Sequence, residues 1–177
     1  MNYFEVFEIE PILNLDLKGL ERKFHELSRK HHPDYHTGRP EAERQTALEM
    51  TALLNDAYRT LRNPTARAEY LIQTQGLSID RSKVPQTLLM EVFEINEELE
   101  RLRSIRQSGG DVRALIEDLR GFQKQINDKR NSYNRQLEQA FTEWDQLVSR
   151  PDTEEKRRQQ LSKLIDIISQ SSYIRNL

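Results

Sequence analysis

The sequence predicts an all-α protein, and three observations support this fold class. Of the 177 residues, 36% are hydrophobic and 32% charged, a balance typical of helices with one buried and one solvated face. Apolar residues recur at helical spacing along most of the chain. The pairs Asn63-Pro64, Gly109-Gly110 and Arg150-Pro151 interrupt these stretches. We therefore expect an N-terminal helical hairpin with flanking short helices, joined to an elongated C-terminal three-helix bundle.

Composition excludes several classes of function. The net charge of −2 gives no general attraction to nucleic acid or anionic lipid. The chain has no apolar run of the roughly 18 residues that a membrane span requires, and no basic segment of a secretory signal. It also has no cysteine, which excludes disulfides and thiolate metal sites. We expect a cytoplasmic protein with no cofactor and with neither a nucleic acid nor a membrane as partner.

Residues 3–7 form a short apolar cluster, predicted to make one or two helical turns before Pro11. Asp16 is a plausible N-cap for a helix that continues to about residue 31. Its two faces differ in character. The apolar face carries Leu17, Leu20, Phe24, Leu27 and His31, and the opposite face carries Lys18, Arg22, His25 and Arg29. Such a basic face is either simply solvated or a contact surface.

The tripeptide His32-Pro33-Asp34 follows directly on this helix. Pro33 lacks an N–H and disfavours the α conformation at His32, so the helix must end near His31. Asp34 places a negative charge on a turn that Arg29, Lys30 and Arg39 surround with positive charge. We expect a rigid, exposed turn that is presented to a partner.

The next helix is predicted from Pro40 to about Asn63, and a shorter one from about residue 65 to 75, with Gly76 as its stop. The apolar positions of the longer helix are Ala47, Met50, Leu54, Ala57, Tyr58 and Leu61. Two antiparallel helices joined by a loop at residues 32–39 complete a domain over residues 1–76. Residues 77–85 are predicted to be a linker.

The remainder, residues 86–177, is predicted to form three helices at about 86–107, 111–148 and 153–174. The middle helix would be roughly 55 Å long at 1.5 Å per residue. Its apolar positions are Val112, Leu115, Leu119, Phe122, Ile126, Tyr133, Leu137, Phe141, Trp144 and Val148. The lengths and breaks indicate an antiparallel bundle.

The first bundle helix has more apolar positions than one face needs. Its inner stripe is Leu88, Val92, Ile95, Leu99 and Leu102. Leu89, Met90 and Phe93 project elsewhere, beside Glu94, Glu97 and Glu100. An apolar patch with a charged rim is typical of a docking surface. Alternatively, the three apolar side chains pack against the N-terminal domain or the third bundle helix.

Several motifs at defined spacing resemble a known family. The tripeptide His32-Pro33-Asp34 follows a basic helix. Two further motifs come after it, Leu54-Asn55-Asp56-Ala57-Tyr58-Arg59-Thr60-Leu61 and Asn63-Pro64-Thr65-Ala66-Arg67. This order and spacing of motifs resembles the J-domain of DnaJ-type co-chaperones. A narrower resemblance, to HscB-type co-chaperones of iron–sulfur cluster assembly, rests on Asn2-Tyr3-Phe4, Arg67-Ala68-Glu69-Tyr70-Leu71 and Leu89-Met90-Glu91.

The resemblance implies two binding sites. A DnaK/HscA-type chaperone ATPase, whose ATP hydrolysis would be stimulated, is expected to bind His32, Pro33 and Asp34, with Arg22, Lys23, Arg29 and Lys30 in support. An IscU-type iron–sulfur scaffold protein is expected on the bundle, at Leu89, Met90, Phe93, Glu94, Glu97 and Tyr173. The chain departs from the family pattern at Arg101, where an acid is expected.

Two other readings stay open. The chain could be a generic J-domain co-chaperone whose bundle binds other clients or oligomerises. The second is a metal site, because His25, His31, His32 and His36 lie close together in sequence. Against it, zinc usually needs three or four converging ligands, and Pro33 keeps His32 and His36 from sharing a regular helix. No nucleophile–base pair, phosphate loop or zinc-protease motif indicates an enzyme.

Overall fold

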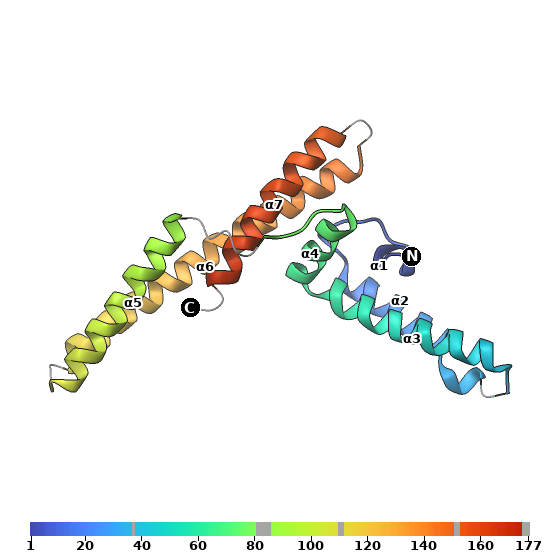
Figure 1. Ribbon diagram of the computed structural model, residues 1–177, viewed down its shortest axis with the longest axis horizontal. Coiled ribbons are helices and arrows are strands. Elements are labelled where there is room, and N and C mark those ends of the chain that lie inside the picture. The colour runs from blue at the N-terminus through green and yellow to red at the C-terminus, as the bar shows by residue number, and fades with distance from the viewer. Residues whose placement is uncertain (37, 81–85, 110–111, 151–152, 175–177) are drawn as a thin grey trace. The chain divides into compact units, whose positions relative to one another are not determined.

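Figure 1 shows the computed structural model, which describes residues 1–36, 38–80, 86–109, 112–150 and 153–174. Side chains at residues 33, 36, 86–89, 91–92, 112–115, 118 and 171–174 lie outside this description. All regular secondary structure in the described ranges is helical, so the predicted all-α class is confirmed. The helices are α1 (Tyr3–Val6), α2 (Leu17–Lys30), the 3-10 turn η1 (Pro33–His36), α3 (Glu41–Arg62), α4 (Pro64–Thr74), α5 (Gln86–Gln107), α6 (Val112–Val148) and α7 (Glu154–Ile174).

Local sequence signals explain most helix ends. The Asp16 side chain accepts a hydrogen bond from the backbone N–H of Lys18 at the start of α2. Asn63 accepts one from the backbone N–H of Ala66, and Pro64 occupies the first turn of α4. Gly76 follows α4 with φ +72°, a conformation that glycine adopts without steric cost.

Contacts divide the chain into two compact units. The first comprises residues 1–78 together with 141–161, and the second comprises the described residues of 79–140 and 162–174. Helix α6 therefore contributes its first 29 residues, 112–140, to the second unit and residues 141–148 to the first.

The core of the first unit lies around α3. Helices α2 and α3 lie side by side as an antiparallel pair, and α1 and α4 also pack on α3 (Figure 1). The largest fully buried side chains there are Phe7, Leu13, Leu54, Leu61, Leu71 and Ile72. Tyr3 and Tyr70 stack with their ring centroids 4.2 Å apart. Leu17 was predicted on the apolar face of α2 but is the first residue of the helix and is 48% exposed.

The end of α6 is attached to the loop between α1 and α2. The Trp144 indole N–H donates to the carbonyl of Pro11 at 2.8 Å, and the side chain is 2% exposed. Asp145 accepts hydrogen bonds from the backbone N–H groups of Leu13 and Asn14 at 2.6 and 2.9 Å. These contacts explain why residues 141–161 group with residues 1–78.

In the second unit, α5 lies beside the first part of α6 (Figure 1). Leu102 is buried, and Ile95 and Leu99 are half-buried, as the inner stripe of α5 predicts. Leu119 was predicted to be a packing residue of α6, yet it is 43% exposed, as is Ile116. One neighbouring helix covers only part of the apolar surface on this stretch of α6, which accounts for the difference.

Candidate functional site

The first candidate surface is the turn after α2. Helix α2 ends at Lys30 as Pro33 predicts, but residues 33–36 form a 3-10 turn rather than an irregular loop. The Asp34 backbone N–H donates to Nδ1 of His32 at 3.3 Å. Asp34 Oδ2 also lies 3.6 Å from this nitrogen. Both contacts hold Asp34 beside the His32 ring.

This turn is anchored on one side and exposed on the other. The Thr51 hydroxyl of α3 donates to the carbonyl of His31 at 3.1 Å, which ties the start of the turn to the hairpin. The His32 ring packs edge-on against Tyr35. The Asp34 side chain is 83% exposed. The turn is thus a fixed protrusion whose polar groups face solvent.

A shallow groove of about 600 Å³ lies next to the turn on α2. It is lined by Arg22, His25, Glu26, Arg29, Lys30 and Tyr35. Three of the four predicted chaperone-binding cations therefore share one surface with the turn. The groove suits an acidic partner surface, since its cations outnumber its single carboxylate.

Lys23, the fourth predicted cation, is held elsewhere. Its Nζ donates to the carbonyls of Phe7 and Glu8 at 2.7 and 3.2 Å, where the chain leaves α1. Glu8 has φ +50°, and a non-glycine residue in this region needs support from its surroundings. Lys23 supplies that support, so the structure gives it an internal partner in addition to its predicted role.

The second candidate surface is the outer face of α5. Met90 and Phe93 are 62% and 69% exposed, and Glu94 and Glu97 are exposed beside them. These four residues lie on one helix face and are the described members of the predicted docking surface, which we call the α5 patch. The side chains of Leu89 and Tyr173, also predicted to belong to it, lie outside the description. Arg101, where the family pattern has an acid, pairs with Glu98 at 2.6 Å.

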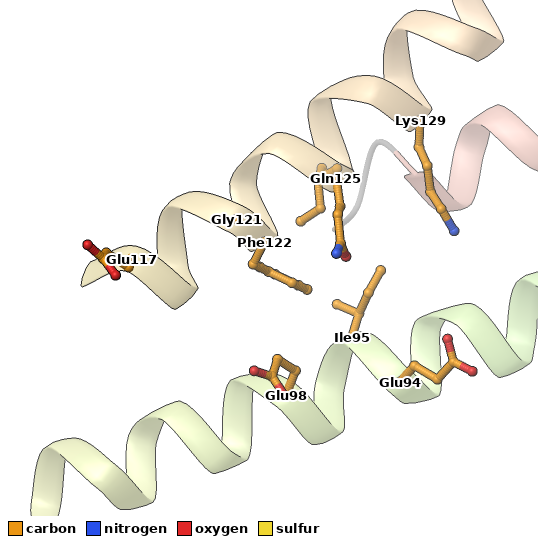
Figure 2. Close-up of a pocket in the computed structure, with 9 residues that line it drawn as sticks. Glu94, Ile95, Glu98, Glu117, Gly121, Phe122, Gln125 and Lys129 are labelled. Carbon is orange, nitrogen blue, oxygen red and sulfur yellow. The ribbon is translucent and has the colours of Figure 1, made fainter. Parts of the chain in front are cut away.

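Glu94 also borders a groove of about 450 Å³ between α5 and α6. Figure 2 shows Glu94, Ile95 and Glu98 on α5 facing residues of α6 across this groove. The lining from α6 is Glu117, Gly121, Phe122, Gln125, Ile126 and Lys129. Apolar side chains form part of the lining, and three of the four charged groups are carboxylates. The acidic character of the α5 patch therefore continues into the groove.

In the ranges that the structure describes, no group of three or more His, Asp or Glu side chains could hold a metal ion. Among the same residues, no helix is long and apolar enough to span a membrane.

The residues that sequence reasoning missed lie in the first unit, at the end of α6 and in α4. Asp145 had no assigned role, Arg67 entered only as part of a motif, and Trp144 was expected only to pack. One signal was available for Arg67. It lies four residues before Leu71, on the buried face of α4, and a charged residue on an apolar face needs a partner.

Two family profiles match the sequence. The one described as "DnaJ domain" matches residues 2–70, and the one described as "HSCB C-terminal oligomerisation domain" matches residues 84–177. Among curated proteins, the "Co-chaperone protein HscB homolog" of Vibrio vulnificus is 33% identical over 85% of this chain and 86% of its own. The protein of the same name from Neisseria meningitidis is 33% identical over 81% of this chain and 83% of its own.

Solved structures give the same result. The chaperone HscB from Vibrio cholerae superposes with a TM-score of 0.61 at 28% identity, covering 99% of this chain and 96% of that one. The human co-chaperone HscB superposes with a TM-score of 0.70 at 21% identity, covering 99% of this chain and 78% of that one, which indicates a shared fold.

Proposed function

The chain belongs to the HscB family of J-domain co-chaperones, and from this premise we propose that it is a non-catalytic adaptor in iron–sulfur cluster assembly. It binds an IscU-type scaffold protein on the α5 patch and delivers it to a DnaK/HscA-type chaperone. It also stimulates ATP hydrolysis by that chaperone. The adaptor supplies no catalytic group; it favours the hydrolysis-competent state of the chaperone by binding that state more tightly.

Two exposed surfaces support this proposal. The Asp34 turn and the α2 groove offer fixed polar and cationic groups to a large acidic partner. The α5 patch offers apolar side chains with an acidic rim, which suits a folded partner carrying apolar and basic groups.

The observation that carries the scaffold proposal is the exposure of Met90 and Phe93. The inner face of α5 is formed without them, because Ile95, Leu99 and Leu102 face the bundle. Among the residues that the structure describes, these two large apolar groups lie on a solvent-exposed face, and interfaces concentrate their binding energy in such anchors.

The test is the double variant Met90→Ala/Phe93→Ala. It should unfold within about 0.5 kcal/mol of the parent, since both side chains are exposed. It should keep its basal stimulation of the chaperone ATPase and bind the scaffold about thirtyfold more weakly, a loss of about 2 kcal/mol measured by calorimetry.

A matched control is Ile116→Ala/Leu119→Ala, which removes two exposed apolar groups from α6 instead. This control should bind the scaffold as the parent does. Unchanged scaffold binding by the α5 variant would reject the proposal. Self-association is the second candidate function, favoured by the match of residues 84–177 to a family described as an oligomerisation domain. In that case the α5 variant would change the sedimentation coefficient and not the scaffold titration.

A further inference from the structure

The groove between α5 and α6 has an apolar floor that the chain itself leaves partly open. Ile95 of α5 and Phe122 of α6 point toward each other across it (Figure 2). Both side chains, and that of Ile126, are only half-buried. Along α6 the lining runs from Glu117 to Lys129, which is about 18 Å of helix. The groove therefore has the length and the floor to hold about three turns of an amphipathic helix.

A glycine occupies the middle of the α6 lining. Gly121 lies inside a long helix, where glycine is the least favourable residue after proline. In the described part of the chain, positive φ values occur at Gly76 and Gly109 and not at this glycine. A Cβ atom added to Gly121 would meet open space, with no described atom of a neighbouring element within 4 Å. The missing side chain thus keeps the groove open and permits close approach by the backbone of another molecule.

The charges along the groove select for a basic occupant. Glu94 and Glu98 border it on α5, Glu117 borders it on α6, and Lys129 is the cation of the lining. Glu98 pairs with Arg101 at 2.6 Å, whereas neither of the other two carboxylates forms an ion pair within the described ranges. A helix with an apolar stripe and flanking Lys or Arg residues would complement this lining.

The groove is also continuous with the α5 patch, because Glu94 belongs to both. A partner that covers Met90 and Phe93 therefore reaches the edge of the groove. A second copy of this chain is a less suitable occupant than a basic partner, since the chain has a net charge of −2 and would bring a surface of like sign on average.

We propose that the α5–α6 groove is a second contact area for the scaffold protein and holds a basic amphipathic helix of it. This inference rests on the proposed function. The helix lays its apolar stripe on Ile95 and Phe122, passes close to the α6 backbone at Gly121, and places cationic side chains beside Glu94 and Glu117. The scaffold is thus recognised by both the α5 patch and α6.

The first experiment fills the groove without disturbing the fold. Gly121→Leu adds a side chain in open space, so its melting temperature should be no lower than that of the parent. Its affinity for the purified scaffold should fall about tenfold or more, because the added side chain occupies the place of the helix. Gln123→Leu is the matched control, on an exposed position of α6 outside the groove lining, and should bind the scaffold as the parent does.

The second experiment removes a charge from the α6 side. Glu117→Gln should weaken scaffold binding about two- to fivefold at low salt, and the difference from the parent should vanish at high salt. Asp128→Asn removes one charge from an exposed position of the same helix outside the groove lining and should match the parent at every ionic strength. Calorimetric titrations at several salt concentrations measure both.

A third experiment shows directly whether the scaffold covers the groove. The chain has no cysteine, so Gly121→Cys introduces a single small thiol there. Its rate of modification by a maleimide is followed through the mass of this chain. Scaffold at about ten times its Kd leaves about one-eleventh of the chain free, so the rate should fall about tenfold. The thiol of Gln123→Cys should react equally fast with and without scaffold.

Three results would overturn the inference. The first is parental scaffold affinity in a fully folded Gly121→Leu protein, and the second is an unprotected Gly121→Cys thiol in the presence of bound scaffold. The third is protection of that thiol that rises with the concentration of this chain alone, which would mean that a second copy occupies the groove. Failure of the proposed function is distinguishable. Absence of scaffold binding by the parent would reject both, whereas binding that only the groove variants weaken would reject the α5 patch alone.

Discussion

At the scale of single residues, the turn after α2 combines rigidity with exposure. Pro33 ends the helix, Thr51 fixes the carbonyl of His31, and the His32 ring accepts the amide of Asp34. These contacts involve backbone or ring nitrogen atoms and leave the Asp34 carboxylate facing solvent. A carboxylate presented in one fixed place is suited to recognition, because little conformational freedom is lost when a partner binds it.

The first prediction concerns this carboxylate. Asp34→Ala should lower stimulation of the chaperone ATPase at least about tenfold, since a charged hydrogen-bonding group at an interface is worth about 1.5 kcal/mol or more. Its unfolding free energy should change by no more than about 0.5 kcal/mol, because the side chain is exposed. Steady-state ATPase assays and thermal melting measure the two effects. Asp166→Ala, an exposed aspartate of α7, is the control, and normal stimulation by Asp34→Ala would refute the assigned role.

At the scale of elements, α2 separates its tasks by face. Leu20 is buried against the hairpin, Lys23 supports the end of α1, and Arg22 and Arg29 line the open groove. The cations of α2 thus differ in their surroundings. Arg22 lies 3.6 Å from the exposed carboxylate of Asp16 and lines the groove with Arg29, whereas Lys23 already has two carbonyl acceptors.

The second prediction tests the electrostatic role of this groove. Arg22→Glu/Arg29→Glu should weaken binding to the chaperone by about tenfold or more at low salt and make the remaining affinity less dependent on salt. Titrations at several ionic strengths measure both effects. Arg130→Glu/Arg135→Glu carries the same charge change on exposed positions of α6 and should behave as the parent does. A salt dependence equal to that of the parent would show that the α2 stripe is merely solvated.

Helix bounds could be predicted because their causes are local. Asp16, Pro33, Asn63 and Gly76 end or begin helices through their own backbone and side-chain chemistry, and each helix lies within about two residues of its expected range. Periodicity placed Met90 and Phe93 off the inner stripe of α5 but left open whether they are exposed or packed, and the structure shows them exposed.

The remaining features depend on tertiary contacts that periodicity does not specify. Leu17 and Leu119 have the correct phase on their helices, but no neighbouring element covers them fully. Asp145 has no periodic signal, because it is defined by the backbone of a loop more than 130 residues earlier, to which the exposed-looking end of α6 docks. Hydrogen bonds to main-chain groups are invisible in a pattern of side-chain polarity.

At the scale of the whole molecule, the boundary between the two family profiles does not coincide with the division into two compact units. The two family profiles meet between residues 70 and 84. The contacts instead extend the first unit to residues 141–161. Stability of the N-terminal helices should therefore depend in part on residues far outside the DnaJ-type profile, through Trp144 and Asp145.

The last prediction follows from this dependence. A fragment of residues 1–78 loses the acceptor of the Leu13 and Asn14 amides and the donor to Pro11. Each such bond contributes about 1 kcal/mol net, and solvation of the loop recovers part of it, so the fragment should be less stable by about 1–3 kcal/mol. For a domain of this size the melting temperature should fall by on the order of 5 to 15 °C. Amide exchange of Leu54 in the buried core of α3 compares the fragment with the full chain. Equal protection of Leu54 in both would mean that the α6 contact leaves the N-terminal helices thermodynamically independent, whereas faster exchange in the fragment would show that the end of α6 is part of the stable fold of the N-terminal helices.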